Sequence, residues 1–235
     1  MVNLDINQGI NVDYKWRLLR AVSRFLKKLP IRKYFVNERL VEHAFVIKNI
    51  DSEGKILDVG CVESQLPIEL ASIGHSVYGI DIRDYPFTHP NFVFGKGDIR
   101  KTNFENEFFD YVISLSTIEH IGLDIYGSDF DEHGDSKSVE EIHRILNVGG
   151  KFILTIPMGK SSIIKNLERI YDYQSVVKLL NGFEIVKEEF YKIVGMERVE
   201  KSNIQELESL EYTTKKDAFS EKTTRGVGLF LCIKR

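Results

Sequence analysis

The sequence predicts a doubly wound α/β fold, in which a mostly parallel sheet is covered by helices on both faces. Three observations support this prediction. From residue 55 onward, short apolar runs alternate with stretches of helical pattern, which is typical of βαβ units. The strand-like runs are apolar, which fits a parallel sheet covered on both faces. Gly60 ends the first run, where a strand must turn sharply into a helix.

The predicted elements follow in order along the chain. Helical stretches fit between several of the strands, at 65–73 and 138–146, and Gly149-Gly150 stops the second of them just before a strand. After Pro157 we expect a helix near 173–180 and two strands that form an antiparallel hairpin around a long polar excursion. We leave that excursion, 195–225, as an insertion with helical tendency. The predicted strands are 55–59, 76–81, 92–94, 109–115, 151–156, 183–190 and 226–234.

An N-terminal extension, residues 1–50, is predicted to precede the domain at 51–235. Apolar residues recur at helical spacing before Pro30, and eight Lys or Arg but one acid fall between Asp13 and Lys33. Such a basic helix either packs on the domain with its charges in water or lies on an anionic membrane surface. A second helix is expected at about 37–50, and together the two helices would form a cap. The apolar residues are Trp16, Leu19, Val22, Leu26 and Leu29.

Composition narrows the class of protein. The chain has 235 residues, 43% hydrophobic and 29% charged, with a net charge of −3, so it can bury one large core. No stretch without Asp, Glu, Lys or Arg is long enough to span a membrane. The start lacks the order of a signal peptide, and Cys61 and Cys232 cannot build a disulfide framework. We therefore expect a cytoplasmic protein, and the near-neutral charge gives no reason to expect a nucleic-acid partner.

The residues at the strand ends predict a nucleoside ligand. Gly60 allows close approach of a ligand to the backbone, and Asp81, 21 residues further on, ends the next strand. A carboxylate at that position can accept hydrogen bonds from both hydroxyls of a ribose. Asp98 and Ile99 follow the third strand, where they can bind the amino group and the ring of adenine. The sequence thus predicts an adenosine-containing ligand in the usual crevice of an open α/β sheet.

The first loop argues against a pyrophosphate in that ligand. The dinucleotide fingerprint needs three glycines, whereas this loop, Gly60-Cys-Val-Glu-Ser64, has one. Glu63 at the start of a helix would repel a diphosphate but tolerate a sulfonium or ammonium group. The loop favours S-adenosylmethionine over NAD.

Five ordered motifs resemble those of class I S-adenosylmethionine-dependent methyltransferases. They are Ile56-Leu-Asp-Val-Gly-Cys61, Tyr78-Gly-Ile-Asp81, Gly97-Asp98, Phe109-Asp-Tyr-Val-Ile-Ser114 and Glu141-Ile-His-Arg-Ile-Leu-Asn-Val-Gly-Gly150. The resemblance covers about residues 50–195 and the final strand. It implies a Rossmann-like, seven-stranded sheet whose last strand is antiparallel.

The resemblance also implies roles for individual residues. The methionine end of the cofactor would approach Asp58, Gly60 and Cys61, and Ser116 would line the methyl-transfer cleft. Asp81 would hold the ribose, Asp98 and Ile99 would hold the adenine, and Ile82 is a further candidate for cofactor binding. Val62 and Ser64 stand where the family usually has a second and a third glycine. A narrower similarity, in Ser116-Thr-Ile-Glu-His-Ile-Gly122 and nearby segments, is to a bacterial subfamily often placed near surface-polysaccharide functions.

His120 and Glu119 are the candidate catalytic residues, because they follow the fourth strand at the lip of the expected cleft. A hydroxyl or amine acceptor loses a proton on methylation, and a base there contributes roughly 10²–10⁴-fold. Alternatively, His120 shapes the loop and Glu119 faces the cofactor's amino group. The acidic segment 129–135 is expected to be a lid or substrate loop rather than a metal site, and no metal is expected. Candidate substrate-binding residues are Tyr126, His133, Arg169 and Tyr171.

The resulting hypothesis is a methyltransferase that uses S-adenosylmethionine to modify a small molecule, such as a sugar or a surface-polysaccharide precursor. Two alternatives stay open. One is a methyltransferase-like domain that has lost turnover and serves as a scaffold or sensor. This alternative rests on Val62 and Ser64, which replace two glycines of the family's motif. The other is an NAD-type oxidoreductase. The sequence does not define the acceptor, the methylated atom or the oligomeric state.

Overall fold

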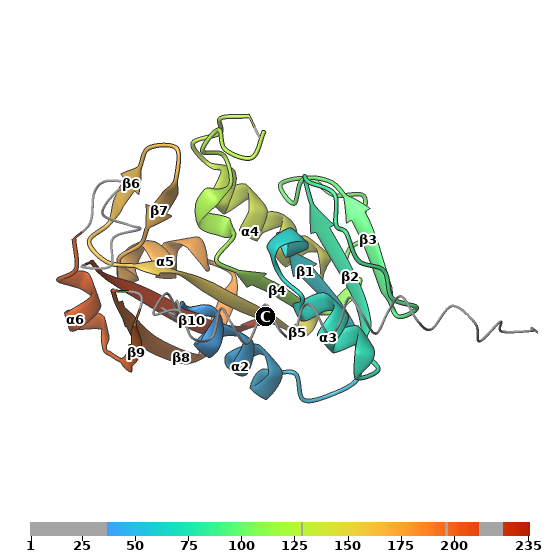
Figure 1. Ribbon diagram of the computed structural model, residues 1–235. Helices are drawn as coiled ribbons and strands as arrows, with labels where there is room; N and C mark the ends of the chain where they lie inside the picture. The colour runs from blue at the N-terminus through green and yellow to red at the C-terminus, as the bar shows by residue number, and fades with distance from the viewer. Residues whose placement is uncertain (1–36, 128, 196, 212–222) are drawn as a thin grey trace, which may run out of the picture. The chain divides into compact units, whose positions relative to one another are not determined.

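The computed structural model describes residues 37–127, 129–195, 197–211 and 223–235. Within the compact unit that begins at residue 36, eight strands form one sheet in the order β3-β2-β1-β4-β5-β10-β8-β9 (Figure 1). The basic stretch at 13–33, and with it the predicted first helix and its membrane alternative, lies outside the described residues. No helix among the described residues is both long enough and apolar enough to cross a bilayer.

The parallel half of the sheet follows the sequence prediction. Its strands are β1 (Lys55–Val59), β2 (Ser76–Asp81), β3 (Phe92–Lys96), β4 (Phe109–Leu115) and β5 (Leu146–Met158). β1 pairs in parallel with both β2 and β4, so the chain crosses over the sheet between them. The carboxyl ends of β1, β2 and β4 therefore meet at one edge, where open α/β sheets bind ligands.

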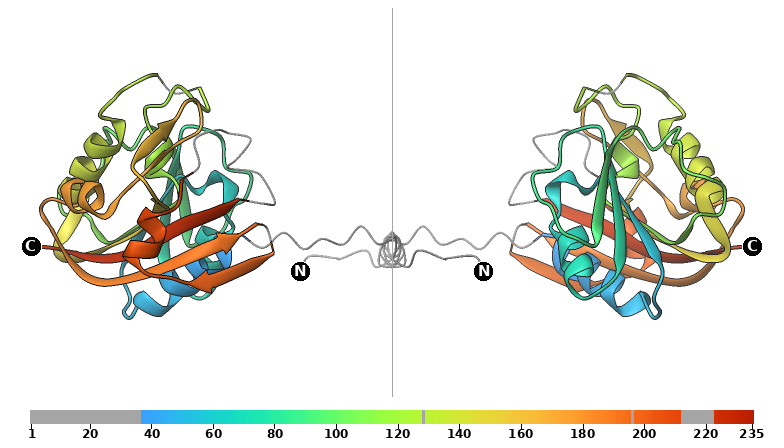
Figure 2. Two further views of the ribbon diagram at one scale, coloured as in Figure 1. Left: turned by 90° about the vertical axis from the view of Figure 1, so that its left-hand side faces the viewer. Right: turned by 90° about the vertical axis from the view of Figure 1, so that its right-hand side faces the viewer.

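The last strand is antiparallel, as predicted. β10 (Thr224–Lys234) lies between β5 and β8 (Phe183–Val194) and runs antiparallel to both, a relation that the two side views also show (Figure 2). The predicted Rossmann-like, seven-stranded α/β sheet is thus confirmed, and β9 (Arg198–Lys201) adds an eighth strand at its edge. β9 and the short helix α6 (Ile204–Glu208) both belong to the segment that the sequence analysis left as an insertion.

Helices cover both faces of this sheet (Figure 1). Alternate strand residues pack on opposite faces: Leu57 joins the core cluster that contains α4 (Gly134–Ile145) and α5 (Tyr173–Leu179). Its neighbour Ile56 joins the cluster with α2 (Arg39–Asn49) and α3 (Leu66–Ser72). This alternation follows from the pleat of a strand, and it explains why the strand segments are apolar on both sides.

Three local features differ from the expected pattern. α4 starts at Gly134, four residues earlier than expected, and β5 starts at Leu146 and contains Gly149, which the analysis placed before the strand. A short hairpin, β6 (Ser162–Ile164) with β7 (Glu168–Ile170), occupies a segment where no strands were expected.

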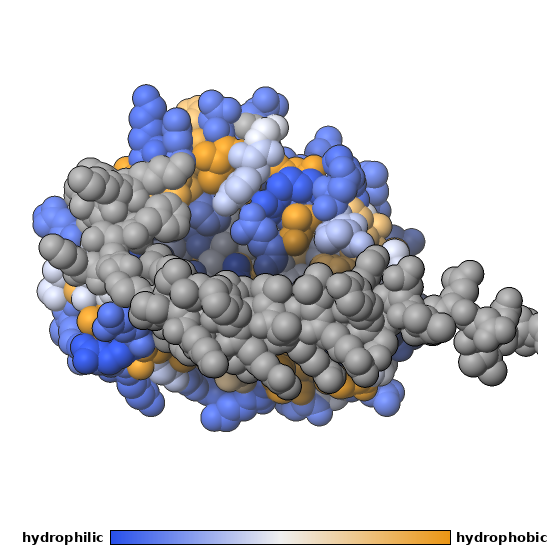
Figure 3. Space-filling view, in the orientation of Figure 1, coloured by the Kyte–Doolittle hydropathy of each residue, from blue (hydrophilic) through white to orange (hydrophobic). Residues whose placement is uncertain are grey.

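On the face shown in space-filling form, hydrophobic and hydrophilic side chains are interspersed over the described part of the surface (Figure 3).

Candidate active site

A cavity of about 320 Å³ opens at the carboxyl ends of β1, β2 and β4. This volume lies within the range of small-molecule sites. The cavity brings together most of the residues that the sequence analysis selected from separate segments. Its lining includes Gly60, Asp81, Ile82, Asp98, Ile99, Ser116, Glu119, His120 and Tyr126.

Gly60 shapes the floor of the cavity. Its φ of 73° lies in the left-handed region, and a Cβ atom there would lie 2.3 Å from Cγ2 of Thr117. Asp58 and Cys61 are buried beside this turn and do not line the cavity, so they would act on a ligand only through the backbone around Gly60.

Ser64 does not need to be glycine in this fold. Its backbone is extended, with φ −123° and ψ 144°. Its hydroxyl accepts a hydrogen bond from the amide of Leu66 at 3.0 Å, at the start of α3. The backbone amide of Val62 donates to Asp81 at 3.1 Å. The two departures from the family's glycine pattern are therefore accommodated by local hydrogen bonds.

Asp81 and Asp98 each hold an arginine two residues further along, because the tripeptide Asp-Ile-Arg occurs at the end of β2 and after β3. One carboxylate oxygen of Asp81 accepts from the backbone amide of Arg83 at 2.9 Å and from its Nε at 3.2 Å. Asp98 pairs with the guanidinium of Arg100 at 2.6 Å. Burial raises the pKa of Asp98, but the hydrogen bonds from Arg100 outweigh burial and lower that pKa overall.

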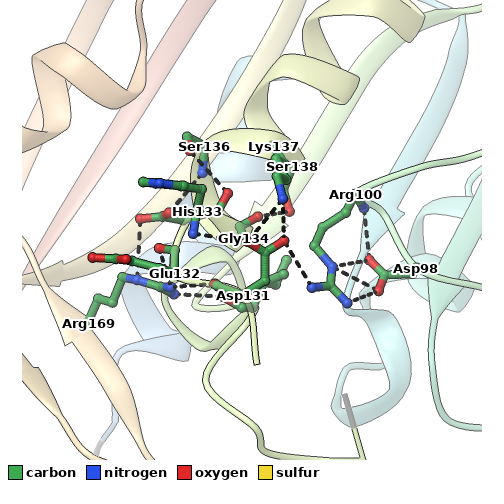
Figure 4. A network of polar contacts seen from close by, with 12 residues as sticks. Asp98, Arg100, Asp131, Glu132, His133, Gly134, Ser136, Lys137, Ser138 and Arg169 are labelled. Carbon is green, nitrogen blue, oxygen red and sulfur yellow. Dashed lines mark hydrogen bonds and ion pairs between the residues drawn. The ribbon is translucent and has the colours of Figure 1, made fainter. Parts of the chain in front are cut away.

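These two arginines connect the strand ends to the loop 122–133. The guanidinium of Arg83 lies over the ring of Tyr126 at 4.4 Å and pairs with Glu63 at 2.6 Å. Arg100 reaches Asp131 at 3.3 Å, and Lys137 reaches the same carboxylate at 2.8 Å (Figure 4). Arg100 therefore ties the segment 129–135, which was expected to be a lid, to Asp98, whereas Arg83 ties Asp81 to Tyr126, which precedes that segment.

Three acceptor groups gather at the other end of the cavity. Glu119 is 1% exposed, and neither of its carboxylate oxygens has a hydrogen-bond partner within the part of the chain that the structure describes. Burial is the main reason that its pKa is well above the ordinary value. His120 follows it, with a pKa that burial lowers, and Glu168 has a pKa that burial raises to about 7. One ligand atom from each of these three side chains lies within 4.8 Å of the others.

Helix α2 and the start of β10 contribute residues that the sequence analysis missed. Glu42 is fully buried and accepts from the hydroxyls of Ser116 at 2.6 Å and Thr155 at 2.5 Å. Arg39 lines the cavity and pairs with Glu42 at 2.9 Å, and Arg225 pairs with Glu38 at 3.5 Å. The sequence offered one hint, the helical spacing of Arg39 and Glu42, but not that they meet the ends of β4 and β5.

Three predicted substrate-binding residues lie elsewhere. The guanidinium of Arg169 donates to the carbonyl of Ile121 at 2.6 Å. It also donates to the carbonyl of Glu132 at 3.2 Å (Figure 4). The hydroxyl of Tyr171 donates to Asp135 at 3.0 Å. His133 is exposed and precedes α4. None of the three lines the cavity, so we do not carry them into the acceptor site. Arg169, on β7, and Tyr171, which follows this strand, instead hold the carbonyls and the carboxylate named above.

Asp58 makes the stability of the protein depend on pH. Burial raises its pKa to about 7, whereas an unfolded aspartate has a pKa of about 4. Between these values the folded state holds a proton that the unfolded state has released, so the contribution of Asp58 to stability falls as the pH rises. The free energy of unfolding of the wild type should therefore fall relative to that of Asp58→Asn as the pH rises from 5 to 8. We expect the difference between the two proteins to change by at least about 1 kcal/mol in favour of the variant.

Urea denaturation at the two pH values measures this gain. The exposed Asp84 offers a control, since Asp84→Asn should track the wild type at both. A constant difference between Asp58→Asn and wild type would contradict the assigned pKa.

Comparison with solved structures identifies the fold. A protein from Methanosarcina mazei, described as an SAM-dependent methyltransferase, has a TM-score of 0.56 and is 17% identical, over 81% of this chain and 96% of that chain. Phosphoethanolamine N-methyltransferase 2 of Haemonchus contortus, in complex with phosphomonomethylethanolamine and S-adenosylhomocysteine, has a TM-score of 0.55 and is 15% identical, over 86% of this chain and 54% of that one. The fold is that of class I S-adenosylmethionine-dependent methyltransferases, as the motif resemblance predicted.

Sequence comparison gives the family. Residues 98–222, more than half of the chain, match the family described as "Caenorhabditis protein of unknown function, DUF268", and the chain belongs to this family. Among curated proteins, Ribosomal RNA large subunit methyltransferase E of Brachyspira hyodysenteriae is 28% identical over 149 residues, which cover 60% of this chain and 77% of that protein.

Proposed function

We propose that this protein is an S-adenosylmethionine-dependent methyltransferase that acts on a small-molecule acceptor. The observation that carries the proposal is the single cavity, described above, that joins two sets of residues. Asp81 and Asp98, suited to a nucleoside, lie at one end, and the unpartnered Glu119 lies with His120 at the other. A methyl donor bound at the first end would present its methyl group toward the second end, and holding the reactants together is most of what methyl transfer needs.

The residues at the nucleoside end fit the cofactor. A Cβ at position 60 would fill the turn, and the buried Asp81 is held in place by the backbone amides of Val62 and Arg83. Ribose hydroxyls would then replace the side-chain bonds of Arg83 while the backbone bonds keep the carboxylate oriented. Asp98 and Ile99 would hold the adenine, and Ser116 the methionine end. When bound, the cofactor supplies a methyl group already activated by a sulfonium.

The acceptor end favours a small molecule over a nucleic acid. Glu38, Glu119 and Glu168 line it, and carboxylates repel phosphates. We propose a sugar or a surface-polysaccharide precursor as the acceptor. The methylation would take place in the cytoplasm. His120 is placed to take the proton that such an acceptor loses.

Titration calorimetry with S-adenosylmethionine, S-adenosylhomocysteine and NAD tests the cofactor. We expect binding of the first two and none of NAD, because the loop 60–64 lacks the other glycines of the dinucleotide fingerprint and contains Glu63, which would repel a diphosphate. Preferential binding of NAD would contradict the proposal. Binding of S-adenosylmethionine without turnover on a broad acceptor panel would favour the scaffold alternative.

Asp81→Asn is expected to weaken S-adenosylhomocysteine binding by about 10–100-fold, because hydrogen bonds to a charged acceptor are worth about 1.5–3 kcal/mol. Calorimetry on the variant measures the loss. Asp84→Asn is the matched control, since Asp84 is exposed and pairs with Lys96 at 3.0 Å away from the cavity. Unchanged affinity in Asp81→Asn would remove the ribose contact from the account.

A further inference from the structure

The cluster of Glu119, His120 and Glu168 gathers two carboxyl groups and an imidazole at one end of the cavity. Among the described residues, neither oxygen of Glu119 has a hydrogen-bond partner, although the side chain is almost completely buried and lines the cavity. Buried polar groups are almost always satisfied, so an orphaned carboxyl that faces a cavity calls for a ligand that satisfies it.

The ring of His120 has a defined orientation. Its Nδ1 lies 2.5 Å from the carbonyl oxygen of Leu167, which can only accept, so Nδ1 carries the proton. In the neutral ring, Nε2 therefore holds a lone pair. That atom lies 3.9 Å from Oε1 of Glu119, a distance too long for a hydrogen bond and open to a donor placed between the two.

The neighbouring charges leave this cluster electronegative. Arg39 is paired with Glu42 at 2.9 Å, and Arg225 with Glu38 at 3.5 Å. Among the described side chains, Glu119 has only the 3.9 Å approach of His120, and no hydrogen bond or ion pair is formed by the carboxyl of Glu168, although Arg225 lies near enough to Glu168 to lower its pKa in part. The ligand that complements this end of the cavity is a cation with several N–H donors.

The spacing of the cluster can be compared with the spacings around an ammonium and around a metal ion. Acceptors around a tetrahedral ammonium, at N···O distances of about 2.9 Å, lie about 4.7 Å apart. Ligands of a tetrahedral zinc ion, at about 2.1 Å, lie about 3.4 Å apart. The observed 3.9 Å between Oε1 of Glu119 and Nε2 of His120 lies between these two values, and the ligand atoms of the cluster lie within 4.8 Å of one another, which leaves room for the nitrogen of an ammonium.

The position of the cluster assigns it to the acceptor. In the sheet order, Asp81 and Asp98 belong to the side of β2 and β3. Glu119 and His120 follow β4, while Glu168 lies on β7 beside β5, on the opposite side. We propose, on the basis of the proposed function, that the acceptor carries a primary ammonium group held by Glu119 and Glu168, and that its nitrogen is the atom that is methylated.

The chemistry of this step balances. The bound ammonium gives one proton to Nε2 of His120, which leaves a lone pair on nitrogen. That lone pair forms the N–C bond to the methyl carbon as the C–S bond breaks, and the electron pair of the broken bond stays on sulfur. The product is a methylammonium, which keeps its charge beside Glu119, and the partly exposed His120 returns the proton to solvent.

Ethylammonium and its neutral counterpart ethanol test this proposal on the full chain saturated with S-adenosylhomocysteine. NMR of the histidine ring nitrogens reports on His120 directly. We expect ethylammonium to shift the His120 signal with millimolar affinity and ethanol to leave it in place. Glu119→Gln should weaken ethylammonium binding at least tenfold while S-adenosylhomocysteine affinity stays within twofold, and the exposed Glu105→Gln is the control.

Three results of these binding experiments would overturn the inference. They are no binding of ethylammonium, equal binding of ethanol, or a shift of the same signal by MnCl₂ or ZnCl₂ that Glu119→Gln abolishes. A parallel loss of S-adenosylhomocysteine affinity in Glu119→Gln would assign Glu119 to the cofactor's amino group and also overturn it. If S-adenosylhomocysteine fails to bind the wild type, the proposed function itself fails, whereas intact cofactor binding without ammonium binding overturns this inference alone.

Discussion

Gly60→Ala is expected to lower the free energy of unfolding by about 3 kcal/mol and to abolish measurable S-adenosylhomocysteine binding, because two costs add at this position. The left-handed backbone costs about 1–2 kcal/mol for a residue with a Cβ. The added carbon would also lie 2.3 Å from Cγ2 of Thr117, so the end of β1 or the segment after β4 must shift. Either shift deforms the floor of the cavity.

Gly149→Ala separates the two costs. Gly149 has a φ of 76°, almost the same as that of Gly60, but a Cβ there would meet nothing within 4 Å. Urea denaturation should therefore show only the smaller, conformational loss for Gly149→Ala. Thr117→Ala in the Gly60→Ala background should recover part of the stability by removing the colliding atoms. Equal losses for the two glycine variants would show that the close approach to Thr117 is not present in solution.

Glu42→Ala is expected to destabilise the protein by a similar amount, about 3 kcal/mol. The substitution leaves the hydroxyls of Ser116 and Thr155 without their acceptor and Arg39 without its counter-charge. Removing one member of a buried charged network is costly because the remaining groups stay buried and unpaired. Ser116, at a positive φ of 45°, depends on this network for its conformation, so cofactor affinity should fall as well.

Chemical denaturation of Glu42→Ala measures the loss, and Lys48→Ala on the exposed side of the same helix is the control. Glu42→Gln, which keeps the volume and one acceptor oxygen, should lie between Glu42→Ala and wild type. A loss in Glu42→Ala no larger than that of Lys48→Ala would mean that α2 is not tied to the strand ends as described.

The sheet and the nucleoside end of the cavity could be predicted because their signals are local. Each strand is a short apolar run, and Gly60, Asp81 and Asp98 stand at strand ends, which meet in any doubly wound sheet. The antiparallel position of β10 could likewise be predicted from two consecutive strands around one long excursion. The eighth strand could not, because β9 is four residues long and lies in a polar segment.

The acceptor end could be predicted only in part. Glu119 and His120 follow a predicted strand, but their partner Glu168 lies on a three-residue strand that no periodicity indicates. Glu42 meets Thr155 across 113 residues of sequence, and nothing in one sequence reports such a pairing. Arg169 and Tyr171 have residue types suited to gripping a sugar, yet the fold uses them to hold carbonyls and Asp135. Residue type alone does not distinguish a side chain that contacts substrate from one that forms hydrogen bonds within the protein.

A crystal structure of the protein grown with S-adenosylhomocysteine tests the central claim most directly. The account predicts the nucleoside at the carboxyl ends of β1 and β2, with its ribose hydroxyls bonded to Asp81 and the sulfur facing Glu119 and His120. An empty cavity at saturating ligand, or a ligand bound elsewhere while Arg83 keeps its side-chain bonds to Asp81, would contradict it.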